Sequence, residues 1–233
     1  MGAWVAVVAI AACGPSEGTP AGDGGSVGSQ GSQSVPADML AEGGTQRVLP
    51  AADFPLEELG FDMGEAAAPV KIVEFSDFGC GYCRKFHGET FPTLLDTWVK
   101  DGVVQWKYVT YVSGQFPNGL QAAFAAECSG EQGHFDEMSE RLYSSQQDWK
   151  GIRDPYPIFE EYGKDIGLDM ETYTSCIAEE RPKARIRSGI LAGARLGVRG
   201  TPSFLVDGYP LVGAQPLNVW NDILSSRVAE LER

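Results

Sequence analysis

The string Cys-Gly-Tyr-Cys at positions 80–83 constrains the fold of this chain more than any other stretch. Just before it, residues 70–77 are rich in β-branched side chains and alternate, which predicts a buried strand. Just after it, apolar residues recur at helical spacing over positions 86–98. The two thiols are therefore expected where a strand ends and a helix begins.

A helix N-terminus changes the chemistry of a thiol. Its unpaired backbone N–H groups carry a partial positive charge, which favours thiolate over thiol. Cys80 is therefore the expected attacking thiol, and Cys83, one turn further on, is the expected buried, resolving thiol. A structural disulfide or half a zinc site are the alternatives, but this spacing in a βαβ context indicates redox catalysis.

Charge and composition exclude several classes of partner and site. The 233 residues carry a formal net charge of −14 with only 18 basic residues, which argues against nucleic acid and anionic membrane surfaces as partners. With five cysteines and two histidines, the chain is poorly supplied for metal binding, so no metal and no other cofactor is predicted. A structural zinc held by the four later cysteines remains the alternative.

Residues 1–12 are almost wholly apolar and uncharged, and are too short to span a bilayer as a mature helix. They predict the apolar region of a secretory signal peptide, although a positively charged start is missing. Residues 10–13, Ile-Ala-Ala-Cys, resemble a bacterial lipobox, which implies that Cys13 becomes a lipidated first residue. The alternative is a buried apolar strand with an incidental cysteine.

A segment rich in Gly, Ser, Pro and Ala follows as far as position 46. It cannot bury enough surface to offset its ordering entropy, so residues 13–46 are interpreted as a lipidated cysteine with a flexible tether. A plain disordered leader fits the composition equally well. The domain itself is then expected over residues 47–233, in an exported protein held in the periplasm or at the cell surface.

The domain shows two α/β halves separated by helices. A second strand is predicted over 103–112, parallel to the first. From about 118 to 196 the period is helical, and a block of about 75 residues exceeds any ordinary connection. Residues 203–206 and 209–212 flank Asp-Gly, which predicts a hairpin. A last helix follows, and its expected inward residues are Val219, Ile223, Val228 and Leu231.

This order of elements resembles the DsbA-like thioredoxin-fold family from about residue 61 to the C-terminus. Local strings that carry the resemblance are residues 68–70, 73–78, 126–128, 132–135 and 200–204. The resemblance implies an α/β thioredoxin fold with a helical insertion between its βαβ and ββα halves. It also implies thiol-disulfide exchange with cysteines of unfolded or partly folded client proteins, and a membrane or soluble redox partner.

Two parts of the active site are implied by the same resemblance. The loop Gly200-Thr201-Pro202 resembles the one that holds a cis-proline opposite the thiols, where the Thr201 backbone would pair with an extended client. An ordinary trans proline before a strand is the alternative. The dipeptide Gly81-Tyr82 lacks the histidine of strong oxidases and resembles that of the disulfide isomerase DsbC. A reductase or isomerase kept reduced by a membrane donor, and a non-catalytic peptide-binding adaptor, are therefore alternative functions.

Glu74 lies six residues before Cys80, on the strand expected to be buried. The resemblance implies that Glu74 transfers protons to or from Cys83, and Lys107 is a candidate counter-charge. A glutamate facing solvent at a sheet edge is the alternative, because most carboxylates are exposed. His87 is expected on the helix surface, outside the site.

Cys128 and Cys176 fall on apolar stripes of two different helices of the insertion. In an exported protein, a structural disulfide between them is the leading interpretation. Two free buried thiols and a second redox pair are the alternatives.

Overall fold

The computed structural model describes residues 56–233. The predicted signal peptide, Cys13 and the tether lie outside these residues. The described chain begins with a short 3₁₀ turn, η2 (Leu56–Glu58), and an edge strand, β1 (Phe61–Met63).

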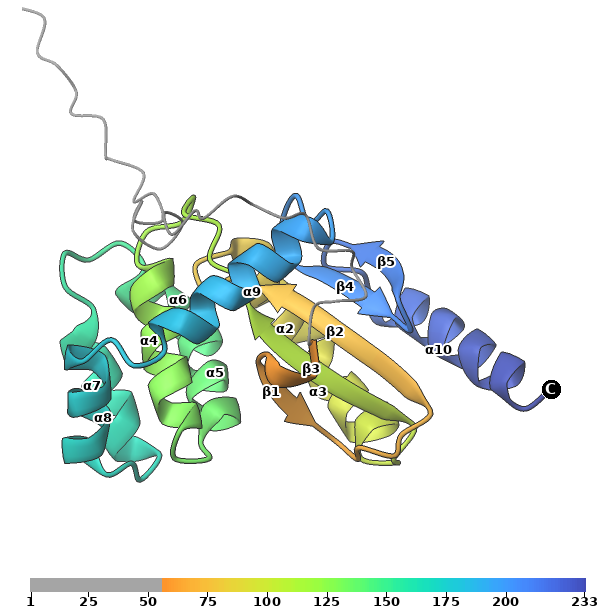
Figure 1. Ribbon diagram of the computed structural model, residues 1–233, viewed down its shortest axis with the longest axis horizontal. Helices are drawn as coiled ribbons and strands as arrows, with labels where there is room; N and C mark the ends of the chain where they lie inside the picture. The colour runs from red at the N-terminus through yellow and green to blue at the C-terminus, as the bar shows by residue number, and fades with distance from the viewer. Residues whose placement is uncertain (1–55) are drawn as a thin grey trace, which may run out of the picture. The chain divides into compact units, whose positions relative to one another are not determined.

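The described residues form one five-stranded sheet in the order β1-β3-β2-β4-β5 (Figure 1). The two central strands, β2 (Val70–Ser76) and β3 (Val104–Thr110), are parallel, as predicted. The other three pairs are antiparallel: β1 with β3, β4 (Ser203–Val206) with β2, and β5 (Tyr209–Val212) with β4. The predicted hairpin at Asp207-Gly208 is present, with positive φ at both positions, which is the backbone of a two-residue primed turn.

The connection between β2 and β3 is helical but broken. Helix α2 (Gly81–Glu89) ends at Thr90, and α3 (Phe91–Leu94) and a π-helical turn, η3 (Leu95–Val99), follow. The break lies beside Pro92, which has no N–H to donate and is tolerated only in a first helical turn.

Helices cover both faces of the sheet (Figure 1). On one face, α9 (Lys183–Arg195) approaches closely through two glycines, and a Cβ atom on Gly189 would lie 2.4 Å from the carbonyl oxygen of Thr110. On the other face, α2 and α10 (Leu217–Leu231) bury an aromatic cluster with the strands. Members of this cluster are Phe86, Trp106, Phe204 and Trp220.

The inward face of α10 differs from the prediction. Trp220 and Leu224 are its buried residues, and Val219, Ile223 and Val228 are half-buried. Leu231 is 52% exposed, so its expected inward position was wrong. Figure 1 shows the reason, because the C-terminal end of α10 extends beyond the sheet and has no layer to pack against.

The predicted helical insertion between the two α/β halves is confirmed. Its helices gather beside the sheet, and α9 leads back across it to β4 (Figure 1). The short helix α6 was not predicted. The members of the insertion are α4 (Gly119–Gly130), α5 (Phe135–Ser144), α6 (Gln146–Trp149), α7 (Tyr156–Asp165), α8 (Met170–Ala178) and α9.

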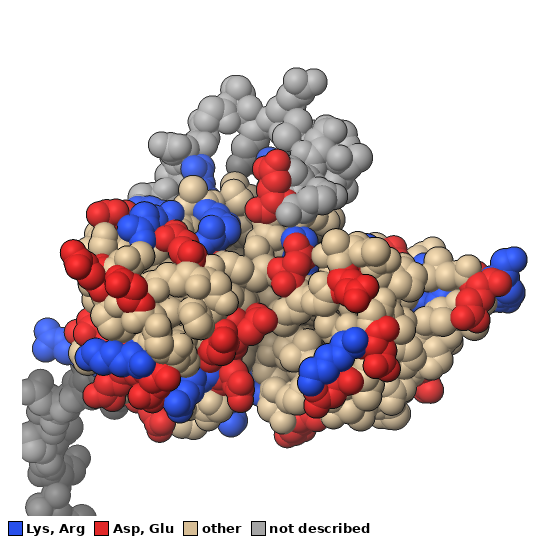
Figure 2. Space-filling model, turned by 90° about the horizontal axis from the view of Figure 1, so that it is seen from below, with Lys and Arg blue, Asp and Glu red and all other residues tan. Residues whose placement is uncertain are grey.

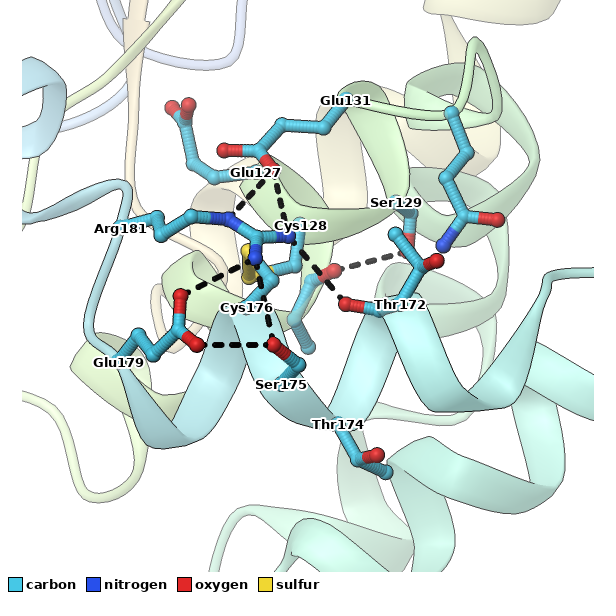
Figure 3. The surroundings of a disulfide bond; sticks show 12 residues. Glu127, Cys128, Ser129, Glu131, Thr172, Thr174, Ser175, Cys176, Glu179 and Arg181 are labelled. Carbon is cyan, nitrogen blue, oxygen red and sulfur yellow. Dashed lines mark hydrogen bonds and ion pairs between the residues drawn. A yellow bond between two sulfur atoms is a disulfide. The ribbon is translucent and has the colours of Figure 1, made fainter.

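A disulfide between Cys128 and Cys176 joins α4 to α8 across 48 residues of chain. Both cysteines are buried. Figure 3 shows Arg181 beside it, where the guanidinium group binds the carboxylates of Glu131 and Glu179. The disulfide and the ion pairs of Arg181 therefore connect parts of the insertion to one another.

Candidate active site

The Cys-x-x-Cys string lies where the sequence placed it, between β2 and α2. Cys80 is the N-cap residue of α2, and Cys83 is its third helical residue. An N-cap side chain usually faces the residue three positions later in the chain. Cys83 is that residue, so the two sulfurs come together at the helix start. Cys83 is fully buried, as expected. Cys80 is only 2% exposed although it lines a groove, so its thiol is less open to solvent than expected.

The loop before Cys80 is held by polar groups from distant segments. Asp77 accepts hydrogen bonds from the backbone N–H groups of Gly79 and Ser113, both at 2.9 Å. Gln146 of α6 donates to the carbonyl oxygens of Phe78 at 2.6 Å and Cys80 at 3.0 Å. Gln146 was not predicted from the sequence. The residues around it do not indicate a short helix, and they do not indicate that Gln146 contacts a loop 66 residues away.

The loop between α9 and β4 faces the thiols. Its Thr201–Pro202 peptide bond is cis. The Cys80 thiol donates to the Thr201 carbonyl oxygen, with a sulfur–oxygen distance of 3.3 Å. Among the described residues, the buried Thr201 hydroxyl has no hydrogen-bond partner. The structure thus brings Thr201 and Pro202 to Cys80 across 121 residues of chain.

The two thiols differ sharply in acidity. A hydrogen bond from Cys83 is the main cause that lowers the pKa of Cys80 from 9.0 to about 6, and backbone N–H groups of Cys83 and Tyr82 add to it. Burial raises the pKa of Cys83 well above its ordinary value. Near neutral pH, Cys80 is therefore the thiolate and Cys83 the thiol.

Glu74 is fully buried beneath the thiols. Its Oε2 accepts from the indole N–H of Trp106 at 2.9 Å, and its Oε1 accepts from the Ser76 hydroxyl. The Ser76 oxygen lies 3.5 Å from the Cys83 sulfur. Two hydrogen bonds therefore connect this carboxyl group to the Cys83 sulfur.

Two expectations about the surroundings of Glu74 were wrong. Lys107 is not its counter-charge, because it forms an ion pair with Asp62 at 2.9 Å. Tyr108 lies beside Glu74 in the sheet, and Lys107, its neighbour on β3, points to the opposite face. His87 is not a surface residue: its side chain is 8% exposed, and its Nε2 lies 2.8 Å from Glu74 Oε1.

Signals for the missed polar residues were present in the sequence. Ser76 follows Glu74 by two positions, so both share one face of β2. His87 follows Cys83 by four positions, so both share one face of α2. The spacing indicates a shared face, but it does not say what covers that face.

A groove of about 1300 Å³ opens beside the thiols, between α2 with α3 on one side and α5 on the other. It is lined by Cys80, His87 and Thr201, and by the exposed side chain of Tyr82. Gly81 also lines it and has open space where a side chain would stand. Figure 2 shows acidic side chains on both sides of a hollow in one face of the molecule.

Residues 56–233 contain no helix long and apolar enough to cross a membrane. The same residues contain no group of three or more His, Cys, Asp and Glu side chains placed to hold a metal ion.

Several known proteins are similar to this chain in sequence. The chain is 31% identical to the Na⁺/H⁺ antiporter NhaA 3 of Salinispora tropica over 147 residues, which are 62% of this chain and 21% of that protein. It is 28% identical to the "Probable disulfide bond formation protein D" of Bacillus anthracis over 151 residues, 63% of this chain and 69% of that one. This chain thus spans about a fifth of the length of the antiporter relative.

Solved structures share the fold at low sequence identity. The crystal structure of alpha-DsbA1 from Wolbachia pipientis superposes with a TM-score of 0.65 and 18% identity, covering 75% of this chain and 98% of that one. The sequence pattern of the family described as thioredoxin matches residues 58–225, which include both α/β halves, the insertion and the thiols. The chain belongs to this thioredoxin family and has the α/β fold with a helical insertion that DsbA proteins have.

Proposed function

We propose that this chain is a thiol-disulfide oxidoreductase that exchanges the Cys80–Cys83 disulfide or dithiol with cysteines of client proteins. One observation carries the proposal: two free thiols at a helix start differ in pKa in opposite directions, and the acidic one lines a groove. Relatives named for disulfide chemistry support it. In this proposal no cofactor takes part, because the S–S bond itself carries the electron pair.

The proposed exchange runs through a mixed disulfide. The Cys80 thiolate attacks a client disulfide, or a client thiolate attacks the Cys80 sulfur of the oxidised pair. Cys83 then closes or releases the bond from its buried position. Thr201 and Gly200 line the groove beside Cys80, so the backbone of this loop can pair with an extended client strand. Such pairing uses main-chain groups and selects client sequences only weakly.

Glu74 has a proposed part in this cycle. Cys83 must lose a proton when it attacks and gain one when it leaves, yet it is fully buried and its pKa is raised. The hydrogen bonds from Glu74 through Ser76 reach the Cys83 sulfur. We therefore assign Glu74 as the group that exchanges a proton with Cys83.

Insulin reduction and refolding of reduced ribonuclease by the purified domain test the proposal. Activity in either assay is expected, and a redox titration of the 80/83 pair against glutathione gives the direction. About 30 mV in potential shifts the exchange equilibrium by about 1.4 kcal/mol, so the potential separates an oxidase from a reductase or isomerase. Activity in neither assay would leave the chain as a peptide-binding adaptor that uses the same groove.

Export and a lipid on Cys13 also belong to the proposal. The apolar residues 1–12 and the lipobox-like string before Cys13 support it. A buried disulfide in the insertion also supports it, since such bonds persist in oxidising compartments. Intact-mass measurement on the membrane fraction of expressing bacterial cells tests it, with a diacylated Cys13 as the expected N-terminus. Recovery of an unmodified Cys13 with Met1 retained would end the idea.

A further inference from the structure

A half-buried histidine, whose side chain is 8% exposed, belongs to the Glu74 cluster and has no role in the exchange proposed above. His87 lies on α2, one turn after Cys83, and its Nε2 is 2.8 Å from Glu74 Oε1. Apolar packing alone would not require a titratable ring to face a buried carboxyl group. The ring also lines the groove, so it touches both the interior and the solvent side of the site.

Aromatic neighbours fix the His87 ring. It stacks on Tyr143 of α5, with ring centroids 4.2 Å apart, and it packs against Phe91 at 4.6 Å. The Tyr143 hydroxyl is 2.5 Å from that of Tyr108 on β3. Burial raises the pKa of both tyrosines well above the ordinary value, so both stay neutral. Glu74 is then the acidic group that faces the imidazole.

Hydrogen-bond distances connect this ring to the resolving thiol without a gap. The Cys83 sulfur lies 3.5 Å from Ser76 Oγ, the Ser76 hydroxyl is hydrogen-bonded to Glu74 Oε1, and Glu74 Oε1 lies 2.8 Å from His87 Nε2. Cys83 has no exposed surface of its own. A proton that enters or leaves Cys83 therefore needs such a path.

We infer that Ser76, Glu74 and His87 form a proton path between the Cys83 thiol and the groove, with His87 as its outlet. This inference rests on the exchange reaction proposed above and adds the route by which its buried thiol is deprotonated. Glu74 alone cannot complete the route, because it is fully buried. His87 is a positioning and relay residue in this path, since it acts on Cys83 only through Glu74.

The step balances as follows in the direction of attack by Cys83. The Cys83 S–H proton passes to Ser76 Oγ, the Ser76 hydroxyl proton moves to Glu74 Oε1, and the carboxyl proton that lies between Glu74 Oε1 and His87 moves onto His87 Nε2. The imidazolium so formed releases its Nδ1 proton to water in the groove. The Cys83 thiolate then forms the S–S bond with Cys80, and the client sulfur leaves as a thiolate with the electron pair of the broken bond. The reverse sequence returns the proton when Cys83 leaves.

His87→Gln separates a proton path from a structural role. Glutamine can still hydrogen-bond to Glu74, but it does not titrate. His134→Gln is the matched control, because His134 is the other histidine of the chain, lies before α5 and pairs with Glu137 at the surface. Ser76→Ala is a second variant that cuts the path at its Cys83 end. The reduced full chain is mixed with oxidised glutathione, and acid-quenched samples give the rate at which Cys83 closes the Cys80 mixed disulfide, over a pH series.

Closure is expected to slow by at least about tenfold in His87→Gln and in Ser76→Ala near neutral pH, and its dependence on pH is expected to differ from that of the wild-type chain. Alkylation of Cys80 by iodoacetamide, which needs only the Cys80 thiolate, should keep its wild-type profile in all variants. A wild-type closure rate and pH profile in His87→Gln would overturn the path. Equal slowing of closure and of Cys80 alkylation would also overturn it, because it would mark a general distortion of the site. Failure of the wild-type chain to form the mixed disulfide at all would instead overturn the proposed function, and the path with it.

Discussion

Cys80 and Cys83 share the first turn of one helix, whereas Cys128 and Cys176 join two helices that are 48 residues apart in sequence. In the first pair, Cys80 lines a groove, and Cys83 lies beneath it beside a cluster of polar side chains. The second pair is bonded and buried, and salt bridges of Arg181 close the surface beside it. The same side chain therefore forms a cross-link at one place and, in the function we propose, carries out exchange at the other.

Position on the helix accounts for much of this difference. A sulfur at an N-cap has free backbone N–H groups near it, and these favour the thiolate that exchange requires. Cys128 lies in the last turn of α4 and Cys176 in the last turn of α8, where backbone N–H groups are already bonded to carbonyl oxygens one turn earlier. Cys128 and Cys176 are both buried, and neither lines the groove beside Cys80.

The largest effect is expected on activity. Cys80→Ser should reduce insulin reduction to the uncatalysed rate, because serine supplies neither a thiolate nor a disulfide at neutral pH. The matched double variant Cys128→Ser with Cys176→Ser should keep most of the activity below its unfolding midpoint. Comparable losses in the two variants would show that the comparison between the pairs is wrong.

The next effect is on stability and should fall on the other pair. In the chain-entropy model, a cross-link that spans 48 residues stabilises the fold by about 4 kcal/mol. The double variant Cys128→Ser with Cys176→Ser should lose about this much free energy of unfolding, measured by urea denaturation without reductant. A bond between Cys80 and Cys83 closes no long loop, so the double variant Cys80→Ser with Cys83→Ser serves as the control. A larger loss in that control would reverse the assignment of roles.

A pH effect should distinguish the reactive sulfur. Alkylation of Cys80 by iodoacetamide should rise with a midpoint near pH 6, the pKa to which the site lowers it. The folded reduced protein then binds this proton more weakly than the unfolded chain, whose thiol has a pKa near 9.0. The stability that Cys80 adds is thus present above pH 9, falls as the pH drops and is lost below about pH 6. Urea denaturation of the reduced protein beside Cys80→Ser measures it, and an alkylation midpoint near that of free cysteine would contradict it.

The smallest effect concerns the charged groups beside the structural disulfide. Arg181 pairs with Glu131 at 3.0 Å and with Glu179 at 3.3 Å, and its side chain is about one-third exposed (Figure 3). Exposed ion pairs contribute little, so Arg181→Met should cost less than about 1 kcal/mol in unfolding free energy. Insulin reduction should be unchanged. A loss of activity in this variant would mean that the insertion communicates with the thiols.

Much of the fold follows from local patterns in the sequence. The strand before Cys80, the helix after it, the helical block and the Asp207-Gly208 hairpin all depend on side-chain period or turn chemistry within a few residues. The start of α8 depends on an equally local contact, because the Asp169 side chain accepts from the Thr172 N–H at 2.7 Å. These elements depend on residues that are close together in the sequence, so they could be predicted without knowing what packs on them.

By itself, the sequence determined the order of the two α/β halves and the helical block between them, and the place of the thiols at a helix start. Tertiary structure alone decided that His87 lies buried against Glu74, that Gln146 holds the loop before Cys80 and that Leu231 extends into solvent. The physical reason is that a helical or strand period fixes the face on which a side chain stands. Whether that face meets a carboxylate, a loop or water depends on segments that are distant in the chain and reach it only when the sheet and the insertion pack together.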